Sequence, residues 1–169
     1  MSITEIPVRR FSVVSSNSFE EVLESLTKVI GRPQIQAFRS ALSAAKTLNE
    51  MEGVVEQAIG PSGLMEFIRF DIGEVLRKEQ GDHAPKVIRL VVGNPLIMKE
   101  MAKTVPDSAS YAPVTILLDE REDGVHLSYD LMASYLANGG NGRAMSTAKD
   151  LDTKVISLIE TAAGKTKHA

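Results

Sequence analysis

The chain contains no cysteine and no tryptophan, and only 5% of its 169 residues are aromatic. The absence of cysteine excludes disulfides, thiolate nucleophiles and cysteine metal sites. The shortage of aromatic rings leaves few platforms on which nucleic-acid bases could stack. The histidines, at positions 83, 126 and 168, have no mutual spacing typical of a metal site. We therefore expect neither a metal nor a cofactor.

Long hydrophobic runs and a strong excess of one charge are also missing. No apolar run approaches the roughly 20 residues that a membrane-spanning helix needs. The net charge is -3 and Lys and Arg do not cluster, whereas nucleic-acid-binding surfaces are basic. The first seven residues lack the basic segment and apolar block of a secretory signal. We expect a cytoplasmic protein that binds neither nucleic acid nor membranes.

The rest of the composition is that of an ordinary globular protein. Hydrophobic residues make up 43% of the chain and charged residues 24%, which favours a folded core over disorder. A chain of this length is expected to form a single domain, residues 1–169. Within it we expect a core at 8–30 and 63–163, an inserted helical segment at 31–60 and a frayed tail at 164–169.

Apolar patterning predicts five strands. Residues 87–92 form a nearly continuous apolar run, as expected of a central strand. Gly93, Asn94 and Pro95 then end the strand and begin a helix, because Asn is a good N-cap and Pro suits the first helical position. The dipeptide Asp123-Gly124 predicts a hairpin. The other strands are predicted at residues 10–14, 64–71, 114–118 and 125–130.

Helices are predicted between most of these strands. Ser18 and Glu21 match a capping box at the start of the first helix. Residues 47–60 fit either a short helix or a loop, and the glycine-rich residues 138–142 fit a linker or a lid. The predicted order is β-α-α-β-α-β-α-β-β-α-α. It favours an α+β fold: a compact two-layer domain with a five-stranded mixed or antiparallel sheet and helices mainly on one face.

Several short motifs occur together between residues 63 and 131. They are Phe67-Ile-Arg-Phe-Asp-Ile72, Leu90-Val-Val-Gly-Asn-Pro95, Asp119-Glu120, Asp123-Gly124 and Leu127-Ser-Tyr129. This combination resembles the domain of unknown function 302 family, and residues 10–22 resemble its opening strand and helix. The resemblance implies a small α+β domain that can pair as a dimer. It implies no reaction.

Polar side chains of neighbouring strands are expected to meet on one face of the sheet, because side chains alternate along a strand. These side chains are Arg69, Asp71, Arg89, Thr115, His126 and Ser128. Paired arginines suit a carboxylate or a phosphate, so this face could hold a small anion. A shift of one residue in the strand pairing would disperse the group.

The sequence is compatible with three functions. The first is a small-molecule-binding or partner-binding domain, expected to be a homodimer, with a small anionic ligand. Its ligand-binding residues would be Arg69, Arg89, Asn94, Thr115 and Ser128. The second is a small enzyme that acts on an anionic substrate, with Asp71 and His126 as the catalytic acid and base. The third is a structural or protein-interaction module whose polar sheet face is the interface.

Overall fold

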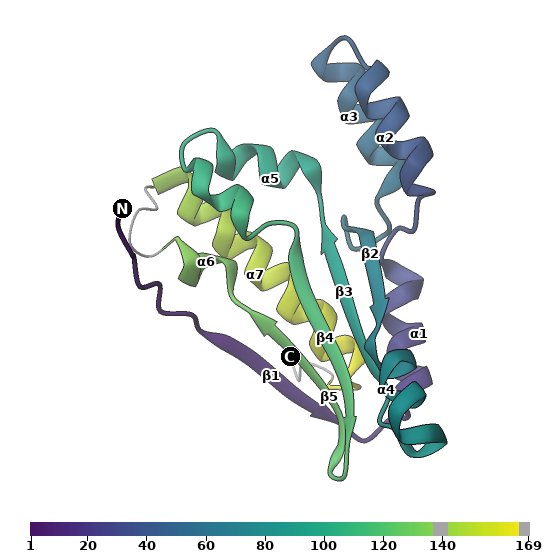
Figure 1. Ribbon diagram of the computed structural model, residues 1–169. Helices are drawn as coiled ribbons and strands as arrows, with labels where there is room; N and C mark the ends of the chain where they lie inside the picture. Colours follow the sequence, from purple (N-terminus) through teal and green to yellow (C-terminus); the bar gives the residue numbers. More distant parts are fainter. Residues whose placement is uncertain (137–141, 166–169) are drawn as a thin grey trace.

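The computed structural model describes residues 1–136 and 142–165. Within them, five strands form one sheet in the order β1-β5-β4-β3-β2, and every neighbouring pair is antiparallel (Figure 1). The strands are β1 (Arg10–Ser15), β2 (Met65–Asp71), β3 (Val87–Gly93), β4 (Val114–Arg121) and β5 (Gly124–Asp130). This arrangement confirms the predicted α+β fold and shows that the sheet is antiparallel rather than mixed.

The described helices follow the predicted order, with one addition. They are α1 (Phe19–Val29), α2 (Ile35–Ala44), α3 (Leu48–Ala58), α4 (Ile72–Gln80), α5 (Pro95–Ala102), α6 (Met132–Tyr135) and α7 (Gly142–Ala162), with 3-10 turns η1 (Gly81–His83) and η2 (Pro106–Ser110). The predicted capping box is confirmed at α1. The added helix is α3, in the segment whose pattern fitted helix or loop. It is capped by the Thr47 side chain, which accepts a hydrogen bond from the Glu50 amide.

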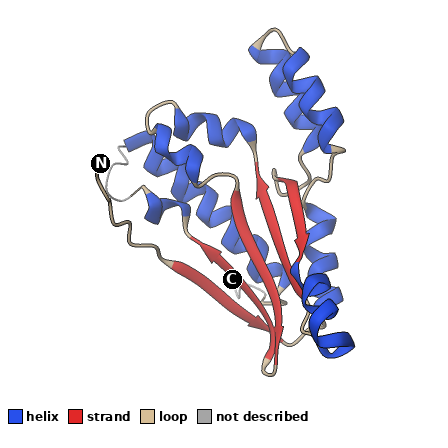
Figure 2. Ribbon diagram, in the orientation of Figure 1, coloured by secondary structure: helices blue, strands red, loops and turns tan. Residues whose placement is uncertain are grey.

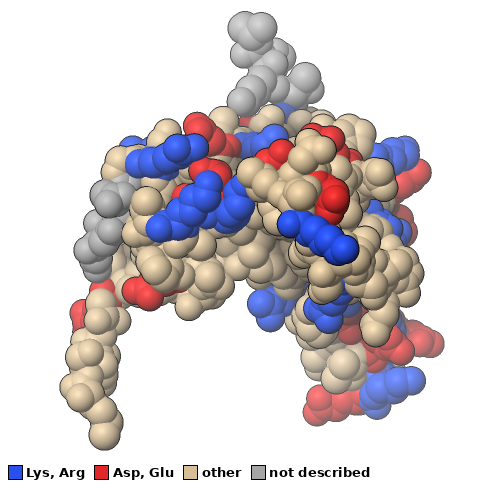
Figure 3. Space-filling model, turned by 90° about the horizontal axis from the view of Figure 1, so that it is seen from above, with Lys and Arg blue, Asp and Glu red and all other residues tan. Residues whose placement is uncertain are grey.

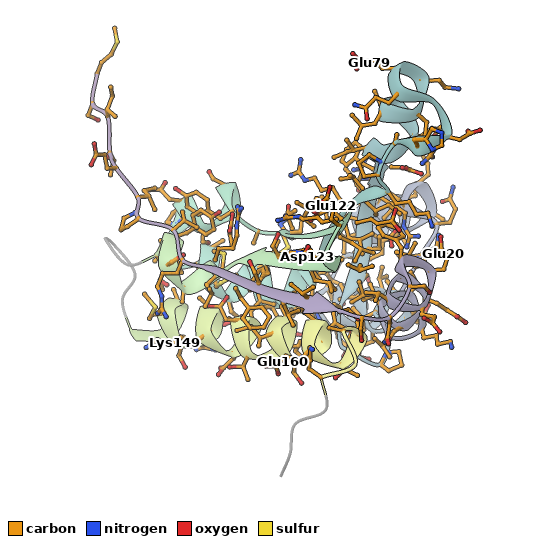
Figure 4. The ribbon with its side chains drawn as sticks, turned by 90° about the horizontal axis from the view of Figure 1, so that it is seen from below. Glu20, Glu79, Glu122, Asp123, Lys149 and Glu160 are labelled. Carbon is orange, nitrogen blue, oxygen red and sulfur yellow. The ribbon has the colours of Figure 1, made fainter. Side chains whose placement is uncertain are left out.

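Most of the helices pack over one face of the sheet, and the other face is largely uncovered (Figure 2). Figure 4 shows α7, marked by Lys149 and Glu160, on one side of the sheet, while the N-terminal segment and α4 rise on the other side. The inward side chains of the central strands are fully buried. They include Leu90, Leu118 and Leu127, and they share one core with Leu26 of α1 and Ile159 of α7. The domain therefore has two layers and one free sheet face.

The helical pair α2–α3 extends beyond the end of the sheet (Figure 1). Its base packs on β2 through a second, smaller cluster of Phe38, Val55, Ala58 and Met65. Backbone segments pass closely there, since the amides of Gly31 and Gly60 both donate to the Leu64 carbonyl, at 2.9 and 3.0 Å. This close crossing anchors the pair to the body of the domain.

Strand register decides which polar side chains share the free face. Leu117 of β4 pairs with both Arg89 of β3 and Ser128 of β5, so the three side chains form one row across the sheet. In β2, the register shifts between Glu66 and Ile68, and Phe70 becomes the partner of Arg89. In each strand, the residues before and after this row belong to the buried core. Since side chains alternate along a strand, the row itself lies on the face opposite the helices.

The prediction that Arg69 and Asp71 join Arg89 is wrong. Arg69 pairs with Leu90 and Asp71 pairs with Ile88, and both partners point into the core layer. The shift in register within β2 is the physical reason, because it places Phe70 instead of its neighbours on the free face.

Two sequence predictions fall partly outside the described residues: the loop at 138–142, of which only Gly142 is described, and the end of the tail at 166–169. No helix in the described ranges is long and apolar enough to span a membrane.

Candidate functional site

A hollow of about 340 Å³ lies on the free face of the sheet. Its floor includes Arg89 of β3, Thr115 and Leu117 of β4, and Ser128 of β5. Its volume is at the lower end of the range that small-molecule sites occupy. Figure 3 shows the molecule hollowed between the N-terminal segment and α4. The free face is therefore concave as well as polar.

The walls of the hollow come from β1, the end of β5, the residue that follows η2 and the last residue of α6. They contribute Arg10, Tyr111, Asp130 and Tyr135. Together with the floor they combine two arginines, one carboxylate, two aliphatic hydroxyl groups and aromatic rings in a single place.

Arg89 is exposed, and within residues 1–136 and 142–165 its side chain contacts an uncharged hydroxyl group and an aromatic ring. Its Nη2 atom donates to Thr115 Oγ1 at 3.3 Å, and its guanidinium carbon lies 5.9 Å from the centre of the Phe70 ring. The ring contact is a cation–π interaction, which orients the guanidinium without neutralising it. Arg89 therefore presents its positive charge to the hollow.

Arg10 differs because it is paired with a carboxylate. Its Nε and Nη2 atoms donate to the two oxygens of Asp130, at 2.6 and 2.8 Å. The hydrogen bond from Arg10 lowers the pKa of Asp130, so this carboxyl group is ionised at neutral pH. The Arg10–Asp130 pair is consequently close to neutral, and the excess charge of the hollow resides on Arg89.

Two tyrosines form the aromatic part of the wall. The rings of Tyr111 and Tyr135 are stacked, with centres 4.4 Å apart and planes 12° from parallel. Burial together with the Asp130 charge raises the pKa of Tyr135. Its hydroxyl group therefore keeps its proton at neutral pH.

A buried carboxylate beneath the hollow holds α6, the helix that carries Tyr135. Asp152 of α7 accepts hydrogen bonds from the Tyr129 hydroxyl at 2.5 Å and from the amides of Met132 and Ala133 at 2.7 and 3.0 Å. Burial raises the pKa of Tyr129, so the phenol stays a donor. This network ties β5, α6 and α7 together below the site.

Three predicted ligand-binding residues meet in the hollow: Arg89, Thr115 and Ser128. Arg69 lies on the other face, where it forms two hydrogen bonds to Glu66, at 3.1 and 2.6 Å. Asn94 is buried and caps α5: its side chain accepts from the Leu96 amide at 2.8 Å and donates to the Gly63 carbonyl at 3.0 Å. Both ends of the Asn94 side chain are therefore occupied.

The two predicted catalytic residues are not brought together. Asp71 caps α4, where it accepts from the Glu74 amide at 2.8 Å and from Arg77 at 3.3 Å. His126 pairs across strands with Val14 on the free face, and its Nε2 atom lies 2.7 Å from Asp123 of the hairpin. Since Asp71 belongs to the opposite face, these two side chains do not form an acid/base pair.

Sequence reasoning missed the four wall residues Arg10, Tyr111, Asp130 and Tyr135, and also Val114, Leu117 and Tyr129. Asp130 could have been found, because it lies two positions after Ser128 and therefore shares its face. Arg10 would then follow as its partner in β1. Tyr111 and Tyr135 lie just after a 3-10 turn and at the end of a four-residue helix, where no strand or helix periodicity places a side chain.

No group of three or more metal-ligating side chains occurs within residues 1–136 and 142–165. The cationic and hydroxyl donors of the hollow suit an anion instead.

The antiparallel sheet with a single helical layer defines the chain as a two-layer α+β domain. The model of the domain of unknown function DUF302 matches residues 38–162, and the chain belongs to this family. A similar solved structure is that of an uncharacterised conserved DUF302 protein from Bacillus stearothermophilus. Its TM-score is 0.61 at 12% identity, over 90% of this chain and 97% of that chain. The likeness confirms the fold alone. No curated protein matches the chain.

Proposed function

We propose that the domain binds a small anion in the hollow, with Arg89 as the charged ligand and Thr115 and Ser128 as hydroxyl partners. The observation that carries this proposal is the position of the Arg89 guanidinium, which lines the hollow between a hydroxyl group and an aromatic ring. A guanidinium directs several N–H donors in one plane and matches the oxygens of a carboxylate or phosphate.

The surroundings of Arg89 favour binding over simple solvation. Val91 and Leu117, its neighbours on the free face, are both partly buried and apolar. The Phe70 ring and the Thr115 hydroxyl group restrict the guanidinium before any ligand arrives. A side chain that is already ordered loses less conformational entropy on binding, so more of the interaction energy appears as affinity.

Isothermal titration calorimetry with acetate and with inorganic phosphate tests this proposal. Replacement of Arg89 by alanine should weaken binding of whichever probe binds by roughly 10- to 150-fold, because a hydrogen-bonded charge is typically worth about 1.5–3 kcal/mol. Arg39→Ala, at an exposed position on α2, is the matched control and should leave the affinity unchanged. Equal affinity in the wild type and Arg89→Ala would contradict the proposal.

We also propose that the chain forms a homodimer through β2 and α4. Four apolar side chains there are unusually exposed: Ile68 at 42%, Phe70 at 46%, Ile72 at 38% and Val75 at 69%. Clustered exposed apolar residues are typical of interaction surfaces. A second copy is the occupant that this surface favours, because β2 is an edge strand and two antiparallel edges can pair about a twofold axis.

A further inference from the structure

We infer that the anion held by Arg89 is the carboxylate of a small planar aromatic molecule whose ring lies against the Tyr111–Tyr135 pair. This inference rests on the proposed anion-binding function and specifies its ligand class. It depends on two features of the hollow, its net charge and its aromatic wall, which are independent of each other.

The charge of the hollow matches a monoanion. Its charged lining residues are two arginines and one aspartate, which gives a net charge of +1. Arg10 directs its Nε and Nη2 atoms at Asp130, so Arg89 is the arginine of the hollow that has no recognised carboxylate partner within residues 1–136 and 142–165. A phosphate dianion would be neutralised only in part, and it would also face the ionised carboxylate of Asp130. A single carboxylate carries half the charge of the dianion, so Asp130 repels it less.

The aromatic wall selects the remainder of the ligand. Tyr111 and Tyr135 are stacked nearly parallel and only partly buried, and both line the hollow. A planar ring can extend such a stack in an offset or edge-to-face arrangement, which contributes beyond the burial of apolar area. The volume of about 340 Å³ leaves room for one small ring with its carboxylate but not for a large cofactor.

The hydroxyl groups of the floor fit the same ligand. Thr115 and Ser128 lie on neighbouring strands, and both line the hollow together with Arg89. They can donate to the carboxylate oxygens that the guanidinium does not reach. The half-buried Leu117, which is the cross-strand partner of Ser128, offers an apolar contact to the ring edge. Charge, donors and aromatic surface are thus presented from one side of the sheet.

The test compares benzoate with cyclohexanecarboxylate, a carboxylate of similar size without an aromatic ring, by calorimetry on the intact chain. Benzoate should bind roughly 2- to 12-fold more tightly, the range expected for one aromatic pair. Arg39→Ala, at an exposed position on α2, should leave both affinities unchanged, whereas Tyr111→Leu should reduce the preference for benzoate. The comparison in the wild type stands even if that variant fails to fold.

The outcomes separate this inference from the proposed function. Equal affinities for benzoate and cyclohexanecarboxylate, or tighter binding of inorganic phosphate than of benzoate, would overturn the aromatic carboxylate. The proposed anion-binding function would still stand if Arg89→Ala weakens the binding of these probes. If Arg89→Ala binds every probe as tightly as the wild type does, both the aromatic carboxylate and the proposed anion-binding function would be overturned. A benzoate preference that depends on Tyr111 and on Arg89 supports both.

Discussion

Asp152 is a buried carboxylate on which the geometry of the hollow depends. It is 5% exposed and accepts hydrogen bonds from Tyr129 and from the first two residues of α6. Because α6 ends at Tyr135, the aspartate also fixes one ring of the aromatic wall. A buried polar group whose hydrogen bonds are all formed stabilises one arrangement of the chain. Loss of this acceptor would leave several buried donors without a hydrogen-bond partner.

We predict that Asp152→Ala lowers the free energy of unfolding by about 3 kcal/mol, since it leaves the Tyr129 hydroxyl group and two amides without their acceptor. Urea denaturation followed by circular dichroism measures the change. Asp150→Ala, at an exposed position on the same helix, should cost less than about 0.5 kcal/mol. Similar losses in the two variants would show that the buried network contributes little.

At the residue scale, the sequence predicted part of the site. Alternation along β3, β4 and β5 correctly placed Arg89, Thr115 and Ser128 on a common face. It failed for Arg69 and Asp71 because a register shift inside one strand inverts the faces of all later residues in that strand. The pattern of polar and apolar residues in the sequence does not reveal such a shift.

The α2–α3 pair is joined to the sheet by a close crossing of two backbone segments. A Cβ atom on Gly60 would lie 2.4 Å from the Val29 carbonyl oxygen and 2.5 Å from the Gly31 nitrogen. The contacts are with backbone atoms, so a side chain can be accommodated only if one segment moves. Gly53, within α3, has nothing within 4 Å of the same position.

We predict opposite effects for alanine at these two glycines. Gly60→Ala should lower the free energy of unfolding by about 1–3 kcal/mol, because the crossing must open. Gly53→Ala should raise it by about 0.5–1 kcal/mol, because alanine has a higher helix propensity than glycine and its methyl group would meet no other atom. Urea denaturation of the two variants and the wild type measures both changes in the free energy of unfolding. A neutral Gly60→Ala would mean that the crossing is loosely packed.

At the element scale, the sequence predicted all five strands and most helices, because each has a periodic apolar pattern or a capping residue. The pattern over α3 fits either a helix or a loop, because its first turn begins with the exposed Leu48 and its apolar side packs mainly on α2. Its stability comes from the α2–α3 contact, which a local pattern does not reveal. The antiparallel strand order likewise depends on tertiary pairing.

The exposed apolar surface on β2 and α4 belongs to the scale of the whole molecule. We predict that the wild-type chain is a dimer and that Val75→Glu shifts it to a monomer, because a charge would be buried at the interface. Light scattering coupled to size-exclusion chromatography gives the mass. Leu48→Glu is the control: Leu48 is also exposed, at 57%, but lies on α3. A monomeric wild type, or a dimer that tolerates Val75→Glu, would contradict this interface.

The central claim is that Arg89 itself meets the anion, and the resonance of its side-chain Nε–H group tests this most directly. That resonance is identified in a ¹⁵N spectrum by its absence from Arg89→Ala, and it is followed while acetate is added. We expect it to move progressively to saturation, whereas the Arg39 resonance on the exposed side of α2 stays in place. An Arg89 resonance that does not move while acetate binds elsewhere would contradict the account.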